Sequence, residues 1–268
     1  MAEARRAGTS RLADRVVPLA VAVVALALWE IAVRMLEVPA YVLPPPSLVA
    51  TTLVTDWDTL YPAWLVTLKV TFMALAVSIV GGVALAFLFA SSRWVERSLY
   101  PFAVVLQVTP IIAIAPLILI YAPSTLVALL LCAWIVAFFP ILSNTVTGLK
   151  SADRNLHELF TLYGATRWQR LRWLLAPSAL PYFLAGLRIA GGLSLIGVVV
   201  AEYTAGTSGQ SSGLAYRILE ASFRLNVARM FAALVLVCVT GIAIFLAFDA
   251  LSRALLGRWH ESEIGEHG

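Results

Sequence analysis

The chain has 268 residues, of which 61% are hydrophobic and only 13% are charged, with a formal net charge of +4. Soluble domains carry about 45–50% apolar and about 25% charged residues, so this chain has too few polar residues to cover a water-exposed surface. The composition therefore excludes an ordinary soluble protein and indicates one that is covered by lipid. Lys and Arg fall in short clusters between apolar runs, which argues against a nucleic-acid-binding face.

The apolar runs predict about six transmembrane helices, because a helix needs about 20 mostly apolar residues to cross the hydrocarbon core. No charged residue occurs from Ser98 to Leu149, which is long enough for two spans with a turn at 122–124. The first run follows a cluster of arginines but is too long for a secretory signal, so we expect it to stay in the membrane. The expected helices are about 16–36, 66–90, 99–121, 125–148, 180–203 and 229–256.

The distribution of basic residues predicts the orientation, because loops rich in Lys and Arg stay on the cytoplasmic side. Basic residues cluster in the segments before 16, at 91–98 and at 149–179, and Arg253 and Arg258 lie near the C-terminal end, whereas 37–65 and 122–124 have none. Only the segment 204–228 disagrees with this orientation, because it contains Arg217 and Arg224 but is predicted to lie on the outer side. We therefore expect a cytoplasmic N-terminal segment 1–15, a transmembrane domain 16–256, and a cytoplasmic tail 257–268.

The loop 149–179 combines basic residues with an amphipathic pattern. Asp153 favours a helix start, Gly164 permits a sharp turn, and we expect a second short helix to end at Pro177 and Pro181. One interpretation is a pair of helices lying among lipid headgroups. The other is a helix that projects into a groove on a cytoplasmic partner.

The spacing in this loop resembles the EAA motif of bacterial ABC importer permeases, EAA-x3-G-x9-I-x-LP. Glu158, Leu159 and Phe160 are followed after three residues by Gly164, and after nine more by 174–177. The segments 43–47, 92–94, 139–144 and 201–203 also resemble the nitrate, sulfonate and taurine type of these permeases, over about residues 40–256.

The resemblance implies an all-α integral membrane protein with the type I ABC importer permease fold and a cytoplasmic EAA coupling helix. It also implies two cytoplasmic ATPase subunits, an extracytoplasmic substrate-binding protein, and a second permease copy, for which we expect a homodimer rather than a heterodimer. The location would be the bacterial inner membrane, with both termini cytoplasmic. The residues implied to couple the chain to the ATPase are Glu158, Leu159, Phe160, Gly164, Ala165, Thr166, Arg167 and Pro177.

The chain itself is not expected to be an enzyme. It has no GxxxxGK[ST] loop that could cradle phosphates, so ATP and Mg²⁺ would be bound by the partner ATPase. Cys132 and Cys238 lie in separate apolar runs without metal-ligand spacing, and we expect no cofactor or metal in this chain.

Polar residues inside the apolar runs are candidates for a translocation pathway, because burying them without partners is costly. The candidates are Gln107, Thr109, Asn144 and Glu202. Hydrogen bonds between helices are the alternative role for each of them. Gln107 and Asn144 could meet across a central pore, and Glu202 could pair with Arg217 or Arg224 at the outer mouth.

Two other functions remain open: a secondary transporter without an ATPase, or a membrane scaffold that holds a cytoplasmic partner. The solute also stays open, because importers of this kind take selectivity largely from the external binding protein. Nitrate, a sulfonate, taurine, a thiamine precursor or a similar small polar or anionic solute would fit.

Overall fold

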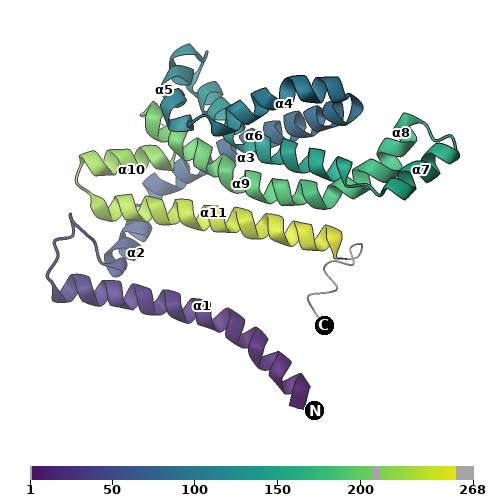
Figure 1. Cartoon of the computed structure of the whole chain (residues 1–268). Helices are drawn as coiled ribbons and strands as arrows, with labels where there is room; N and C mark the ends of the chain where they lie inside the picture. The colour runs from purple at the N-terminus through teal and green to yellow at the C-terminus, as the bar shows by residue number, and fades with distance from the viewer. Residues whose placement is uncertain (1, 207–211, 258–268) are drawn as a thin grey trace. The chain divides into compact units, whose positions relative to one another are not determined.

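The structure is a computed structural model that describes residues 2–206 and 212–257, and within these ranges it contains helices and no strands. The helices are α1 (Ala2–Met35), α2 (Pro46–Thr55), α3 (Trp57–Ser91), α4 (Arg93–Val108), α5 (Ile111–Tyr121), α6 (Thr125–Lys150), α7 (Arg154–Leu162), α8 (Arg167–Arg170), the π-helical η1 (Leu171–Leu175), α9 (Ala176–Ala205), α10 (Leu214–Phe223) and α11 (Val227–Leu256) (Figure 1).

Five helical segments of the described chain are long and apolar enough to cross a membrane, and a sixth is a bent pair of helices. The prediction of an all-helical membrane protein with about six spans is therefore confirmed. The five segments are Val16–Met35, Trp57–Ser91, Thr125–Lys150, Arg167–Ala205 and Val227–Leu256, and the bent pair is α4 with α5.

The helix predicted at 99–121 is instead two helices that meet at 102°. Pro110 has no N–H to continue the helix, and its ring disfavours a helical conformation for the residue before it. Thr109 accordingly leaves the helix with φ −69° and ψ 122°. Pro116, in contrast, lies within α5.

The prediction that Pro177 and Pro181 end a short helix is wrong. The chain runs helically from Arg167 through α8, η1 and α9 to Ala205. Pro177 lies in the first turn of α9, where its missing N–H is tolerated. The π turn before it is closed by the Ala176 N–H, which donates to the carbonyl of Leu171.

By its backbone contacts the chain divides into two compact units, and the larger comprises Pro62–Tyr216 and Leu236–Gly268. Its centre is the antiparallel pair α6 and α9, which lie side by side in Figure 1. Added Cβ atoms on Gly186 and Gly197 would lie 2.7 Å from the Pro140 carbonyl and from the Ala133 Cα. Small residues thus allow the two helices to approach closely, as is common in membranes.

The smaller unit comprises Met1–Tyr61 and Arg217–Val235. In it, Glu30 on α1 accepts hydrogen bonds from Arg34 at 2.6 Å and from the backbone N–H of Ser47 at 3.0 Å. Because Ser47 lies in the first turn of α2, the second bond joins α1 to the start of α2. The expected N-terminal segment 1–15 lies mostly within α1, whereas residues 258–268 of the expected tail lie outside the described residues.

Candidate functional site

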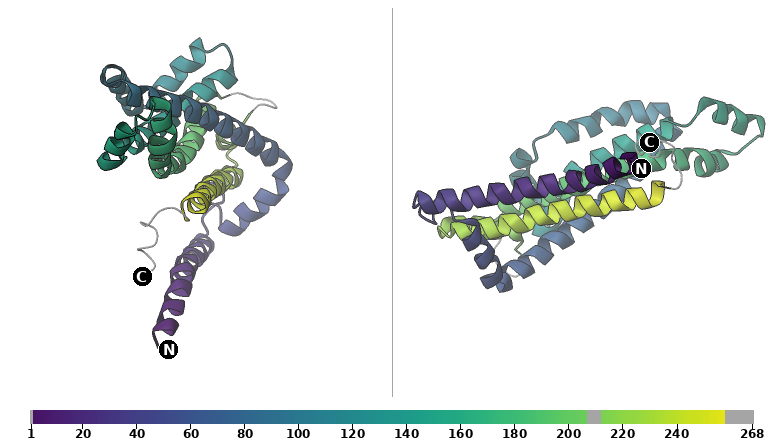
Figure 2. Two further views of the ribbon diagram at one scale, coloured as in Figure 1. Left: turned by 90° about the vertical axis from the view of Figure 1, so that its right-hand side faces the viewer. Right: turned by 90° about the horizontal axis from the view of Figure 1, so that it is seen from below.

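The loop between α6 and α9 folds into a helical hairpin of residues 153–170, which we call the coupling hairpin after the role that its sequence resemblance implies. Its helices α7 and α8 extend beyond the ends of α6 and α9 (Figure 2). Asp153 caps α7, since its side chain accepts from the Asn155 N–H at 2.6 Å. Thr166 and Gln169 form a reciprocal capping box at the start of α8.

The turn of the hairpin is built around Gly164, which adopts φ +64°. The Ala165 N–H donates to the Phe160 carbonyl at 2.9 Å, and the Gly164 N–H donates to the Thr161 carbonyl at 3.0 Å. These two bonds make a Schellman motif, whose left-handed position favours glycine. The sharp turn expected at Gly164 is therefore present, and the hairpin is specified by its own local sequence.

The coupling hairpin exposes large apolar side chains. Leu162 and Tyr163 are 84% and 83% exposed, and Trp168 is 67% exposed. A groove of about 380 Å³ lies between the two arms and is lined by Leu159, Phe160, Tyr163, Ala165, Gln169 and Trp173. Apolar groups this exposed mark a surface for a partner or a lipid layer.

The residues implied to couple the chain to a partner all lie in or next to this hairpin. Leu159, Phe160 and Ala165 line the groove, and Thr166 caps α8. Glu158 is exposed on α7, with a carboxylate oxygen 3.5 Å from Arg154. Arg167 begins α8, whereas Pro177 lies beyond the hairpin in the first turn of α9.

At the opposite end of α9, Glu202 is buried in a hydrogen-bond network rather than exposed at a mouth. Its side chain is 2% exposed, and the Thr67 hydroxyl donates to its two carboxylate oxygens at 2.9 and 3.1 Å. The backbone N–H groups of Leu214 and Ala215, at the start of α10, donate to Thr67 Oγ1 at 2.9 Å and to Glu202 Oε2 at 3.2 Å.

This network contains residues that the sequence did not reveal. Thr67 is fully buried on α3, and Gly213 is so close that an added Cβ would lie 1.9 Å from Glu202 Oε1. Arg217 and Arg224, which the sequence suggested as partners of Glu202, belong to the smaller unit. Both arginines bind Glu220, at 2.8 and 3.0 Å.

The other candidate pathway residues lie on α4 and α6 or at the break after α4. Gln107 is exposed near the end of α4, and the Thr109 hydroxyl donates to the Val105 carbonyl at 2.7 Å. Asn144 Nδ2 donates to the Pro140 carbonyl at 2.8 Å within α6. Among the described residues, Gln107 and Asn144 therefore form no hydrogen bond with each other.

A charged pair lies farther along the apolar helices of the larger unit. Asp249 on α11 binds Arg188 on α9 at 2.8 Å and Arg253 one turn away at 2.7 Å. The guanidinium of Arg188 also lies 5.4 Å from the centre of the Phe245 ring. An ion pair of this kind satisfies charges that would be costly alone in lipid.

Comparison with known families decides which class of membrane protein this is. Residues 78–258 match the family described as "binding-protein-dependent transport system inner membrane component". The chain belongs to this family. It is thus a multi-pass inner-membrane transport permease, and the match includes the coupling hairpin and α9.

Curated relatives narrow the type of permease. The permease is 37% identical over 71% of its length to the formylaminopyrimidine transport permease of Halalkalibacterium halodurans, covering 74% of that protein. It is 36% identical over 65% of its length to a riboflavin transport permease of Chloroflexus aurantiacus, covering 63%. It is also 30% identical over 69% of its length to an aliphatic sulfonates permease of Bacillus subtilis, covering 65%.

A solved structure supports the fold. The permease matches a chain of the inward-facing MetNI methionine ABC transporter with a TM-score of 0.62 and 20% identity, over 73% of the permease and 95% of that chain. The expectation of a type I ABC importer permease of the sulfonate and nitrate type is confirmed.

Proposed function

We propose that two copies of the permease assemble with two cytoplasmic ATPase subunits and receive solute from an extracytoplasmic binding protein. ATP and Mg²⁺ would be bound and used by the ATPase subunits, since the permease sequence has no phosphate-binding loop. The clusters of basic residues support an orientation with both termini and the coupling hairpin in the cytoplasm.

The observation that carries this proposal is the exposed apolar surface of the coupling hairpin. A lipid-seated helix would bury its apolar face and keep its polar face in water. Here the groove residues Leu159, Phe160 and Tyr163 lie on a hairpin that extends beyond the neighbouring helices (Figure 2). We propose that the ATPase covers this groove, with Glu158, Gly164, Ala165, Thr166 and Arg167 shaping the contact.

Movement of the hairpin would reach the membrane through the segment Arg167–Ala205, which is helical throughout. Pro177 lies where this segment leaves the π turn. A continuous helix transmits displacement along its length. ATP-driven closure of the two ATPase subunits would therefore tilt α9 against its tightly packed neighbour α6. Such rigid-body tilting is one of the known routes of conformational switching.

The break between α4 and α5 is the best-supported part of a translocation pathway. Non-helical backbone at membrane depth is tolerated where it is buried in protein or lines a water-filled cavity. We propose that Gln107 and Thr109 line the pathway at this break and that Asn144 lies farther along it. Glu202 would hold the wall in place through its buried network rather than touch the solute.

The solute would be a small polar or anionic molecule. Relatives are named for transport of formylaminopyrimidine, riboflavin and aliphatic sulfonates, which all carry polar heteroatoms. We propose a solute of this kind, including a nitrate, sulfonate, taurine or thiamine-precursor type, with the binding protein setting the choice.

The test is ATP-driven uptake by proteoliposomes that contain the permease, a co-expressed candidate ATPase and a candidate substrate-binding protein. Leu159→Ser should reduce ATPase co-purification and uptake together. Thr161→Ala, on the opposite face of α7, is the matched control and should leave both unchanged. Uptake that needs no ATP would contradict the proposal in favour of a secondary transporter, and ATPase retention without uptake would favour a scaffold.

A further inference from the structure

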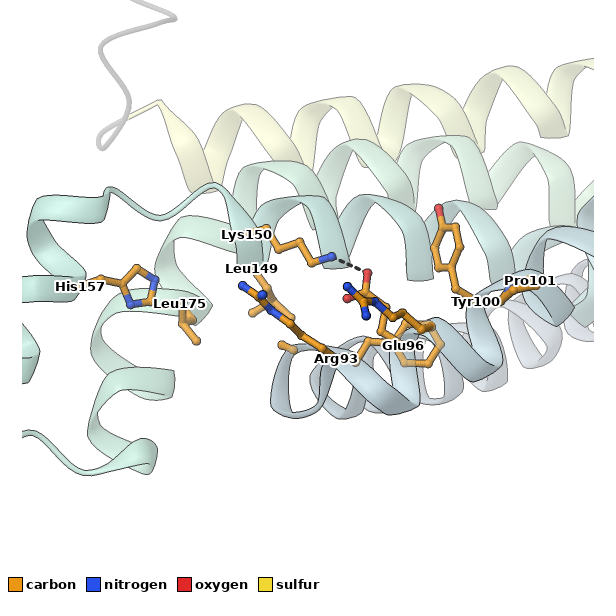
Figure 3. A pocket seen from close by; sticks show the side chains of 11 residues that line it. Arg93, Glu96, Tyr100, Pro101, Leu149, Lys150, His157 and Leu175 are labelled. Atoms are coloured by element: carbon orange, nitrogen blue, oxygen red, sulfur yellow. Dashed lines mark hydrogen bonds and ion pairs between the residues drawn. The ribbon is translucent and has the colours of Figure 1, made fainter.

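A cavity of about 750 Å³ lies between α4, the end of α6 and the coupling hairpin, and it carries several cationic side chains (Figure 3). Arg93 and Arg97 come from the first turns of α4, Lys150 is the last residue of α6, and His157 comes from α7. Glu96 is the one carboxylate in this lining, and it is paired with Lys150.

A second cavity of about 520 Å³ adjoins the first, since the two share Ala90, His157 and Leu175. It adds Arg167 and Arg170 from α8. In the described part of the chain, Nε of Arg170 is buried and has no hydrogen-bond partner. A buried donor without a partner is costly, so a ligand acceptor at this place would stabilise the site.

The charges of the two linings do not balance. They contain five Lys and Arg side chains and the single carboxylate of Glu96. Because Lys150 is paired with Glu96, the four arginines have no carboxylate within the linings. Most of the other lining residues are apolar or aromatic, among them Phe89, Tyr100 and Leu175.

We propose that these adjoining cavities bind a phosphate-bearing ligand, with an anionic membrane phospholipid as its source. Guanidinium groups recognise phosphate through paired hydrogen bonds, and basic pockets between membrane helices hold lipid headgroups. The apolar walls would accept the glycerol and the first acyl carbons. Inorganic phosphate is the other source of the same chemistry.

The position of the site gives the ligand a structural consequence. Arg93 and Arg97 belong to α4, whereas Arg167 and Arg170 belong to the coupling hairpin. A phosphate group between them would join the hairpin to the membrane-embedded helices. The binding itself needs neither solute nor ATP, so it can be tested apart from transport.

The test is native mass spectrometry of the full-length permease, with its ATPase, titrated with short-chain phosphatidylglycerol or phosphatidylcholine and separately with inorganic phosphate. Each arginine near anionic lipid should contribute about fivefold in affinity, so Arg93→Gln with Arg97→Gln should weaken phosphatidylglycerol binding about 25-fold. Arg93→Lys with Arg97→Lys should restore most of it.

Glu96→Gln should have the opposite effect, strengthening binding about fivefold, which a misfolded protein cannot produce. The control is Arg154→Gln, because Arg154 lies on the same hairpin, is 92% exposed and is outside both linings. Selective phosphatidylglycerol binding supports the lipid source, and competition by inorganic phosphate supports the free anion. Equal losses with Arg154→Gln, or equal binding of phosphatidylcholine, would overturn the proposal.

Discussion

The hydroxyl of Thr67 donates to the carboxylate of Glu202, although the two residues are 135 positions apart in the chain. The same hydroxyl oxygen accepts the N–H of Leu214, so it joins α3, α9 and the start of α10 at one buried point. This relationship leads to the first two predictions.

Thr67→Val should destabilise the permease by about 1–3 kcal/mol, because it leaves a buried carboxylate and a buried N–H without this partner. Thr67→Ser should keep most of the stability. The control is Thr71→Val one turn along α3, which removes only a bond from a buried hydroxyl to the Thr67 carbonyl. Thermal unfolding in detergent measures the difference, and equal losses for both valine variants would contradict the role of the network.

Gly213→Ala should lower stability strongly, because its Cβ would lie 1.9 Å from Glu202 Oε1. Gly206→Ala provides the comparison: it has φ +54° and nothing within 4 Å of the added Cβ, so it should cost only about 1 kcal/mol of backbone strain. The readouts are the yield of monodisperse protein and its melting temperature. A Gly213→Ala protein as stable as Gly206→Ala would mean that α10 can move away from Glu202.

Gly164 tests the turn of the coupling hairpin, since it has φ +64° and no atom within 4 Å of an added Cβ. The effect of substitution should therefore be purely one of backbone conformation. Gly164→Asn should be well tolerated, and Gly164→Val should impair ATPase co-purification, because β-branched residues rarely adopt this conformation. If asparagine and valine impair ATPase co-purification equally, binding of the ATPase requires the absence of a side chain at position 164 rather than the turn conformation.

Asp249 forms ion pairs with two arginines, so its loss should lower the stability more than the loss of either arginine. Asp249→Asn would leave Arg188 and Arg253 without their carboxylate, whereas Arg188→Gln leaves the pair of Asp249 and Arg253 at 2.7 Å. We expect Asp249→Asn to cost about 1–2 kcal/mol and Arg188→Gln to cost less. Thermal unfolding in lipid nanodiscs measures the order, and the reverse order would show that Arg188 acts through other contacts.

Gln107 separates a pathway role from a structural one. Its side chain is exposed beside the break at Pro110, so Gln107→Leu should reduce ATP-driven uptake while leaving the melting temperature unchanged. Asn144→Ala is the informative comparison, because it also removes a bond to the Pro140 carbonyl. Unchanged uptake with Gln107→Leu would place the solute elsewhere.

The apolar runs were sufficient to predict about six helices, because crossing lipid imposes a minimum length and few charges. Helix interruptions were harder to place. Both Pro110 and Pro177 remove an N–H, but Pro110 breaks its helix and Pro177 does not, since the π turn delivers the chain into α9 with Pro177 in its first turn. Local sequence does not distinguish these outcomes.

The coupling hairpin could be located from sequence because its signals are local: Asp153 and Gly164 act on their immediate neighbours. The Glu202 network could not be found this way. Thr67 is an unremarkable polar residue in an apolar run, and only the folded chain brings it to Glu202 and the start of α10.

The π turn of η1 sets the orientation of the coupling hairpin relative to α9. A π turn holds one residue more than an α turn, and each residue of an α-helix rotates the chain by about 100° about its axis. Deleting one residue within Leu171–Leu175 would turn this stretch into ordinary α-helix and swing the hairpin by roughly that angle relative to α9. The orientation of the hairpin about the α9 axis thus depends on the number of residues in η1. A one-residue deletion that keeps every groove side chain would still turn the groove away from its partner.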